Sequence, residues 1–293
     1  MDRVLITGGS GYVGARVVAH LARRGEPLRL LVHEGPVAAP GAEVVRGDVR
    51  YPRPEWFEGV RAVIHLAACT RSRRPRRYFE HNALATARLV DAVRTFEKPP
   101  LVVFASSIAA TGPGRSHAGG RADGRPRSEP VTSYGLSKLL AERALETLPR
   151  WVALRLPMVY GTGDRSLTLL RRLVRLGVAP TSAHRFSGIC VDDVALLIAG
   201  LLDRAEPPNA VCTVSDGESY SFEALADHLA RVAPLLRVPV GLPGLAILAG
   251  WALGNPDLAA YVTQDWLQPM SDVLDYRPRF HLYELLGAVR ATR

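Results

Sequence analysis

The chain has 293 residues, of which 47% are hydrophobic and 22% are charged, a composition that is ordinary for a globular enzyme and excludes a disordered chain. The formal net charge is +9, yet only Lys98 and Lys138 among the 37 basic residues are lysines, and the arginines are spread over every segment. Because this charge is a bias of the whole composition and not a single stripe, we expect no nucleic-acid partner.

The cysteines and the apolar stretches indicate the compartment. Cys69, Cys190 and Cys212 are widely spaced and form no C-x-x-C pair, so the sequence predicts no disulfide framework and no metal site. The longest apolar stretch, residues 242–253, is shorter than the ~20 residues that a membrane-spanning helix needs. A strand-like run opens the chain and leaves no room for a signal peptide. We therefore expect a cytoplasmic protein that binds no membrane.

The first predicted unit is a strand over residues 4–6, a glycine turn over residues 7–14 and a helix over residues 15–24 that Gly25 ends. Glycine permits backbone conformations closed to other residues, and it lets a pyrophosphate approach the amides at a helix N-terminus. Between a strand and a helix, this pattern indicates a dinucleotide site. The candidate cofactor contacts in the turn are Thr7, Gly8, Ser10, Gly11, Tyr12, Val13 and Gly14.

The next predicted strand, residues 28–32, ends at His33. An acidic residue usually binds the adenosine ribose at this position, and a basic residue suits a 2′-phosphate. Since no acid stands at the strand end itself, we expect His33 to face a 2′-phosphate and NADP(H) to be preferred over NAD(H).

Predicted strands over residues 42–46 and 62–66 also lead to candidate cofactor contacts. Asp48 is expected to accept from the adenine amino group, and the small residues after the fourth strand let the backbone lie close to the cofactor. The candidates at these two strand ends are Asp48, Val49, Leu66, Ala67 and Ala68.

A helix over residues 78–96 and a strand over residues 101–105 follow, and Ser107 comes directly after. This alternation predicts an α/β fold with a doubly wound parallel sheet and right-handed crossovers. Ligands of such sheets bind at the carboxyl ends of the strands, which is where Ser107 lies. A loop rich in glycine, proline and arginine over residues 112–132 leads to a helix from Tyr134 to about residue 147.

A sixth strand over residues 151–156 is followed by a less regular tail. Helices are expected over residues 167–176, 222–232, 245–253 and 282–289, and residues 189–195 lead a further helix to about residue 202. A strand is expected over residues 210–214. We expect residues 1–157 to form a dinucleotide-binding domain to which residues 187–203 return. Residues 158–186 and 204–293 are expected to form a smaller, mainly helical substrate lobe.

One dense charge cluster stands apart from these elements: Arg71, Arg73, Arg74, Arg76 and Arg77. Charge runs are usually solvated, which is our expectation here. Attraction of an anionic group on the cofactor or the substrate is the alternative.

Tyr134 and Lys138 lie one turn apart on one helix face. Hydride transfer to a carbonyl needs a proton donor. The ordinary tyrosine pKa of about 10 is too high for ready ionisation, and a nearby ammonium group lowers it. We therefore expect Tyr134 to donate the proton, Lys138 to lower the Tyr134 pKa and hold the nicotinamide ribose, and Ser107 to donate a hydrogen bond to the developing oxyanion.

In combination, these motifs resemble those of the extended short-chain dehydrogenases/reductases, which are similar to NAD-dependent epimerases and dehydratases. The matching segments are residues 7–14, 47–49, 65–68, 82 with 86, 106–107, 134–138, 157–161 and 191–195. The resemblance implies that Ser107 and not Ser106 faces the substrate carbonyl, and it adds Asn82, Pro157 and Val159 to the residues on the cofactor side. It also implies a monomer or a homodimer.

The resemblance leaves several reactions open. Ile108 and Ala109 stand where related dehydratases have an Asp-Glu pair, which disfavours dehydration, and residues 110–112 and 186–190 depart from the nucleotide-sugar enzymes. Residues 238–243 and 274–285 are similar to the tail of the dihydroflavonol reductase and hydroxysteroid dehydrogenase-like branch. We therefore expect NADPH-dependent reduction of a ketone on a fairly apolar small molecule, such as a polyketide, a flavonoid or a steroid-like compound.

The alternatives are a nucleotide-sugar epimerase or 4-ketoreductase and a non-catalytic, cofactor-sensing binding protein. Candidate contacts to the ketone or alcohol substrate are Ser107, Thr111, Met158, Trp251, Trp266 and Met270, and Tyr261 is a further candidate for the lining of the pocket. Core packing is the alternative for the large tail residues, since aromatic side chains serve both purposes.

Overall fold

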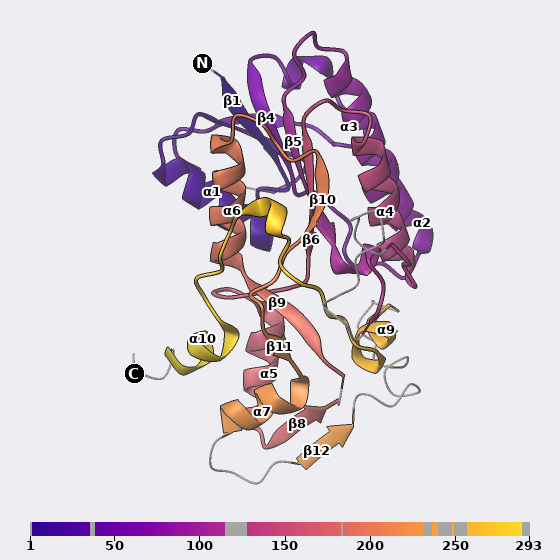
Figure 1. The fold of residues 1–293 in the computed structure, drawn as a ribbon, viewed down its shortest axis with the longest axis vertical. Coiled ribbons are helices and arrows are strands. Elements are labelled where there is room, and N and C mark those ends of the chain that lie inside the picture. The colour runs from indigo at the N-terminus through magenta and orange to yellow at the C-terminus, as the bar shows by residue number, and fades with distance from the viewer. Residues whose placement is uncertain are drawn as a thin grey trace.

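The computed structural model describes residues 2–35, 39–114, 128–182, 184–230, 236–239, 248 and 257–288 (Figure 1). Its strands are β1 (Arg3–Thr7), β2 (Leu28–Val32), β3 (Glu43–Arg46), β4 (Val60–His65), β5 (Leu101–Ser107), β6 (Trp151–Leu156), β7 (Met158–Tyr160), β8 (Val178–Thr181), β9 (Phe186–Cys190), β10 (Ala210–Thr213), β11 (Ser219–Tyr220) and β12 (Leu236–Pro239). Its helices are α1 (Tyr12–Arg23), α2 (Pro75–Tyr78), α3 (Ala85–Arg94), α4 (Ser133–Leu145), α5 (Arg165–Arg175), α6 (Val191–Asp203), α7 (Phe222–Ala230), α9 (Leu258–Thr263) and α10 (Leu282–Ala288). Short turns complete the set: η1 (Pro54–Trp56), η2 (Phe79–Leu84), η3 (Ile108–Ala110) and η4 (Asp272–Leu274).

The large sheet has the strand order β10-β6-β5-β4-β1-β2-β3, and all of its pairings are parallel. The strand order reverses at β1, which lies between β2 and β4. A doubly wound sheet opens a crevice beyond the carboxyl ends of its strands at such a reversal. The predicted fold class is therefore confirmed, and the reversal marks the place where folds of this class bind their ligands.

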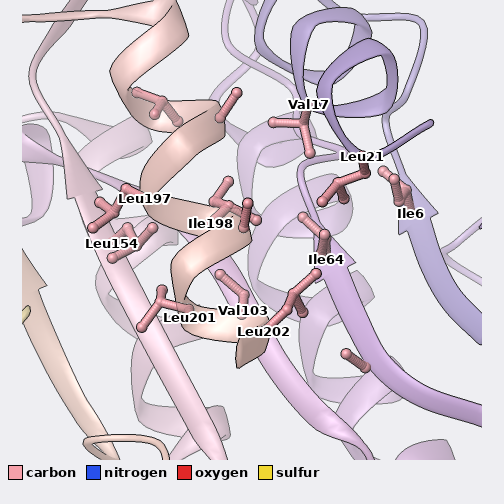
Figure 2. Packing of buried hydrophobic residues seen from close by; sticks show 14 of the residues in the cluster. Ile6, Val17, Leu21, Ile64, Val103, Leu154, Leu197, Ile198, Leu201 and Leu202 are labelled. Atoms are coloured by element: carbon pink, nitrogen blue, oxygen red, sulfur yellow. The ribbon is translucent and has the colours of Figure 1, made fainter. Parts of the chain in front are cut away.

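Helices cover both faces of this sheet, α1 and α6 on one side and α3 and α4 on the other (Figure 1). On the α1 and α6 side, apolar residues spaced three and four apart on each helix meet the inward side chains of the strands, as helical and strand periodicities require. Figure 2 shows Val17 and Leu21 of α1, four leucine and isoleucine residues of α6, and Ile6, Ile64, Val103 and Leu154 of the sheet in one cluster.

The remaining elements form a second body, here called the C-terminal lobe, made of β7, β8, β9, β11, β12, α5, α7, α9 and α10. A sheet of β11, β9 and β7 and a pair of β12 and β8 support it. A third apolar cluster fills it, with Tyr160, Phe186, Tyr220 and Trp266 among its buried members. Within the residues described, no helix has the length and apolar character to cross a membrane.

Several elements differ from the sequence prediction. The strand near residues 210–214 was expected in the substrate lobe, but β10 pairs with β6 and extends the large sheet. A short apolar run fits either sheet, so its period could not decide between them. The helix expected over residues 78–96 begins at Pro75 and contains the π-helical turn η2. Of the helix expected over residues 245–253, only Leu248 lies within the described residues.

A buried carboxylate fastens the C-terminal segment to α6. Asp193, in the first turn of α6, is 0% exposed. It accepts a hydrogen bond from the Tyr276 hydroxyl (2.7 Å) and from the backbone amides of Arg279 (3.0 Å) and Phe280 (3.2 Å). One side chain therefore serves three donors from a segment more than 80 residues away, as their separations of 83, 86 and 87 positions record.

Replacing Asp193 by alanine is expected to lower the free energy of unfolding by about 2 kcal/mol or more, because the donors lose their acceptor within the protein. Tyr276→Phe removes a single donor and is expected to cost about 1 kcal/mol. Urea unfolding of both variants measures the difference. Equal losses in the two variants would mean that the amides of Arg279 and Phe280 do not depend on Asp193.

Candidate active site

Ser107 is the last residue of β5, and its side chain caps the short turn η3 that follows. Its Oγ accepts a hydrogen bond from the backbone amide of Ala109 (3.1 Å), which caps η3. The pairing of Ser107 with Leu156 of β6 fixes its backbone in the sheet. The hydroxyl therefore lies at the edge where the fold places ligands.

The helix that carries Tyr134 and Lys138 packs backbone to backbone against this turn. A Cβ added to Gly135 would lie 2.2 Å from the carbonyl oxygen of Ala109, closer than any side-chain carbon can approach a backbone oxygen. The Thr132 hydroxyl accepts from the Gly135 amide (3.0 Å) and caps the helix. Glycine at position 135 thus brings the first turn of α4 up to η3 and to Ser107.

Tyr134 is partly buried. Burial raises its pKa to about 12, and a hydrogen bond with the Ser107 side chain opposes that rise. The surroundings of Tyr134 therefore leave its pKa above the ordinary value, and the lowering expected from Lys138 stays a prediction. Desolvation disfavours the phenolate more than the surrounding groups favour it.

Lys138 is 2% exposed and donates a hydrogen bond from Nζ to the carbonyl oxygen of Ala105 (2.7 Å). Its Nζ lies 4.6 Å from the centre of the Phe104 ring and 6.0 Å from the centre of the Tyr134 ring. Burial lowers the Lys138 pKa to about 7, and Glu142 acts in the opposite direction. Lys138 is thus held beside the Tyr134 ring, and its protonation depends on burial and on Glu142.

Asn82 joins the loop after β4 to the catalytic helix. It lies in the π-helical turn η2, and such turns recur at functional sites. Its Oδ1 accepts from the Cys69 amide (2.8 Å), and its Nδ2 donates to the Cys69 carbonyl (3.0 Å) and to the Ser137 hydroxyl (2.9 Å). Asn82 therefore fixes the position of α4 relative to the loop that follows β4.

His65 is a buried residue for which the sequence motif gave no separate role. Its Nδ1 lies 2.7 Å from Thr7 Oγ1 and its Nε2 lies 3.0 Å from Thr86 Oγ1. Burial, and then the charge of Lys138, lower the His65 pKa to about 3. The ring is therefore neutral at physiological pH and links β1, β4 and α3 below the site.

The glycine turn forms a cradle that fits a dinucleotide. A Cβ on Gly14 would lie 2.0 Å from the Gly8 carbonyl oxygen, and a Cβ on Gly8, whose φ is +72°, would lie 2.5 Å from the Ala67 amide nitrogen. No side chain caps α1 at Gly11, so the first amides of this helix remain available to an anion. The Ala67 amide donates to Thr7 Oγ1 (3.2 Å), which brings the β4 end against the turn. The other predicted turn residues, Ser10, Tyr12 and Val13, lie in or beside it.

At the adenosine end, charged groups of both signs meet. His33 Nε2 lies 3.4 Å from Asp48 Oδ2 and His33 Nδ1 lies 3.6 Å from Glu34 Oε1. Arg50 donates to the Asp48 carboxylate, and Arg46 reaches from β3 to the Gly35 carbonyl (2.9 Å). Despite the burial of Asp48, hydrogen bonds with Arg50 hold its pKa below the ordinary value. His33 and Asp48, each predicted separately as a cofactor contact, thus lie in contact with one another. Val49 is the residue after Asp48.

The predicted substrate contacts divide into two groups. Met158 packs in the same apolar cluster as Tyr134, and the Thr111 hydroxyl accepts from Arg155 Nη1 (3.2 Å) one turn after Ser107. Trp266 is instead a core residue, 2% exposed, whose Nε1 donates to the Ala260 carbonyl (2.9 Å). Met270 packs against the cluster between the sheet and α6.

Other predicted positions need a brief account. Trp251 lies outside the described residues. Pro157 and Val159 fall at the junction of β6 and β7, and Leu66 and Ala68 fall beside Ala67 after β4. The arginines 71, 73, 74, 76 and 77 are exposed, and Arg76 pairs with Glu80 (2.6 Å).

Two residues at the site, Tyr78 and Glu142, were missed by the sequence analysis as site residues. The Tyr78 ring stacks edge-on against Tyr134, with centroids 5.7 Å apart, and it reaches the site only through tertiary packing. Glu142 lies one turn after Lys138, and that helical spacing was the one signal that could have singled it out. Tyr261 of α9, an expected pocket-lining residue, lies near Tyr134: burial raises the Tyr261 pKa, and the Tyr134 phenol adds to that rise.

Gly135→Ala is expected to push α4 away from η3 and to lower turnover by about 10- to 100-fold, because small displacements of reacting groups are costly. Gly200→Ala is the matched control: its added carbon in α6 meets no atom within 4 Å, so this change should raise the free energy of unfolding by about 0.5–1 kcal/mol and leave turnover unchanged. Steady-state kinetics and thermal unfolding measure both. Normal turnover in Gly135→Ala would show that the close contact is dispensable.

Comparisons with known proteins agree with this geometry. A sequence profile of the NAD dependent epimerase/dehydratase family matches residues 4–206. The chain is 28% identical over 265 residues to a ceramide reductase of Caulobacter vibrioides, covering 85% of this chain and 76% of the relative. It is 26% identical over 258 residues to an ADP-L-glycero-D-manno-heptose-6-epimerase of Pseudomonas paraeruginosa, covering 76% of each.

A third relative is matched over a shorter stretch. The chain is 30% identical over 171 residues to a UDP-2-acetamido-2,6-beta-L-arabino-hexul-4-ose reductase of Pseudomonas aeruginosa, covering 56% of this chain and 37% of that reductase. Among solved structures, MoeE5 in complex with UDP-glucuronic acid and NAD superposes with a TM-score of 0.78 at 21% identity, covering 99% of this chain and 100% of MoeE5. WbmG of Bordetella bronchiseptica, in complex with NAD and UDP, gives 0.77 at 19% identity, with 99% and 94% covered. At these identities the two structures show the fold.

Proposed function

We propose that this chain, which belongs to the NAD dependent epimerase/dehydratase family and is an NAD(P)-dependent oxidoreductase, reduces a ketone on a fairly apolar small molecule to a secondary alcohol. The observation that carries the proposal is the convergence of Ser107, Tyr134 and Lys138 at the carboxyl end of β5. These three groups supply a serine hydroxyl, a phenolic proton and an amine at one edge of the sheet.

Each of these side chains has a part in the reaction. Bound NAD(P)H supplies the hydride for the carbonyl carbon. Tyr134 donates its phenolic proton to the carbonyl oxygen, and its raised pKa keeps that proton in place at neutral pH. Ser107 donates a hydrogen bond to the same oxygen as its negative charge develops. The Lys138 ammonium then stabilises the phenolate that the proton leaves behind.

Residues of the glycine turn would hold the pyrophosphate, and the β2 and β3 ends would hold the adenosine. We propose that NADP(H) is preferred, because His33 lies in the turn after β2, Arg46 reaches that turn from β3, and basic side chains there suit a 2′-phosphate. Glu34 and Asp48 oppose this preference by their charge, although Arg50 offsets the charge of Asp48.

The apolar substrate is supported by the surroundings of Tyr134. Tyr78 and Tyr261 approach it from α2 and α9, and Met158 packs in the same cluster. We propose that the C-terminal lobe, which supplies Tyr261 and Met158, closes on the substrate. The likeness to a relative named ceramide reductase, over 85% of this chain, fits a substrate with a large apolar part.

A nucleotide-sugar epimerase is the second candidate, favoured by the relative and structures of that kind. An epimerase retains its oxidised cofactor through the cycle, so freshly denatured protein should release stoichiometric NAD. A ketoreductase exchanges its cofactor at each turnover and should reduce members of a panel of aryl and polycyclic ketones. Mass spectrometry of the released cofactor, together with NADPH and NADH oxidation on that panel, separates the two functions.

Tyr134→Phe is expected to lower turnover by about 100-fold or more while cofactor affinity stays close to that of the wild type, because only the proton donor is removed. Tyr283→Phe removes a hydroxyl in α10, outside the site, and should keep the full rate. Kinetics and fluorescence titration with NADPH measure the two effects. A Tyr134→Phe enzyme with most of its rate would assign the proton to another donor.

Arg46→Ala is expected to weaken NADPH binding by about tenfold, the effect of one lost charge-assisted hydrogen bond of roughly 1.4 kcal/mol. NADH binding, measured in the same titration, is the internal control and should change little. Equal losses for the two cofactors would argue against a 2′-phosphate at this position.

A further inference from the structure

A buried ion pair lies under the catalytic helix. Glu142 of α4 and Arg155 of β6 are each 1% exposed. Arg155 donates from Nε to Glu142 Oε1 (2.9 Å) and from Nη2 to Glu142 Oε2 (2.7 Å), and the Ser106 hydroxyl donates to Oε1 as well. The carboxylate therefore has donors on both oxygens and is held in one orientation.

The same guanidinium reaches both sides of the segment that joins Ser107 to Tyr134. Arg155 Nη1 donates to Thr111 Oγ1 (3.2 Å) and Nη2 donates to Ser128 Oγ (2.8 Å). The pair also contacts Ser106, the residue directly before Ser107, through the Glu142 carboxylate. Replacing a buried ion pair by apolar residues is often neutral or stabilising, so stability alone does not account for this arrangement.

Lys138 lies on the same helix face as Glu142, four residues earlier, where side chains meet. Among the described residues, Glu142 is the one anion that acts on the Lys138 charge. Tyr134 and Glu142 stand on its own helix, Phe104 and the Ala105 carbonyl on β5, and the neutral His65 on β4. Arg155, on β6, adds a second buried cation behind Glu142.

We propose that Glu142 is a positioning residue that keeps Lys138 positively charged in the buried site, with Arg155 as the counter-cation that sets how much of the Glu142 charge Lys138 feels. The inference deepens the proposed function and rests on it for its catalytic meaning. It concerns a side chain that touches neither the substrate carbonyl nor the hydride.

The charges of the three groups cannot change independently. Arginine keeps its proton in proteins, whereas a buried lysine loses its proton readily. With Glu142 neutral, two cations would remain in one dry region, and Lys138 is the one that would become neutral. The direction of the Lys138 pKa agrees: burial lowers it to about 7, and Glu142 raises it.

The chain allows a direct measurement, because Lys98 and Lys138 are its only lysines. Lysine labelled with ¹³C at Cε gives two signals, which Lys98→Arg assigns, and the Lys138 signal is titrated against pH in protein without substrate. Glu142→Gln should move its midpoint down by about one pH unit or more. Arg155→Met should move it up, since Glu142 then keeps the neutral Ser106 hydroxyl but loses the cation that offsets its charge. The double variant should titrate between the two.

Opposite shifts for the two partners of one ion pair distinguish this role from a structural one, which would disturb both variants alike. Shifts in the same direction, or none, would overturn the proposal. Where one single variant does not fold, the double variant is compared with the other. Its Lys138 midpoint must lie below that of Arg155→Met, or above that of Glu142→Gln. Circular dichroism confirms that each protein compared is folded.

Catalysis gives the second readout. In the reductive direction, kcat/KM of Glu142→Gln should fall at a lower pH than that of the wild type and recover on acidification. If the signal shifts as expected but no ketone is reduced, the proposed function fails and the charge relationship stands. If ketones are reduced while the Lys138 midpoint stays fixed in every variant, the role of Glu142 fails and the reaction stands.

Discussion

The close packing of Gly135 against the Ala109 carbonyl is the constraint on which the geometry of the candidate site depends. It places the first turn of α4 on the turn after β5, and the hydroxyl, phenol and ammonium groups gather there because of it. The sheet provides the edge and Asn82 fixes the helix from the other side. With a side chain at this position, the same residues would be present in the same order without being within reach of one another.

Buried charge is the second organising feature, and in each case a carboxylate receives several donors from distant segments. Asp193 joins α6 to the C-terminal segment, Asp216 accepts from the hydroxyls of Tyr160 of β7 (2.5 Å) and Tyr220 of β11 (2.6 Å) inside the lobe, and Glu142 joins β5, β6 and α4. A buried anion is costly unless its oxygens are satisfied. Each therefore specifies one arrangement of the segments around it more sharply than apolar packing would.

The sequence predicted the α/β architecture because buried parallel strands are short apolar runs, and because the ends of such strands share one edge. That rule placed Ser107 and the glycine turn at one edge, and the resemblance to the family added Tyr134 to them. It could not assign β10 to the large sheet, since a four-residue run carries no information about its partner. Trp266 and Met270 were candidates for substrate contact, but large apolar side chains fill cores and pockets alike. The raised pKa of Tyr134 depends on burial, which is set by tertiary structure.

The position of β10 bears on how the molecule can move. The chain leaves the large sheet after β6, returns to it in α6 and β10, and enters the C-terminal lobe again at β11. The large sheet domain and the lobe are therefore joined by several chain connections and not by a single linker. A hinge absorbs motion through the dihedral angles of a few residues. Here a rotation of the lobe would require such changes at every crossing at once. Closure of the lobe on a substrate, as proposed above, would then be a small rotation that leaves all of these connections intact.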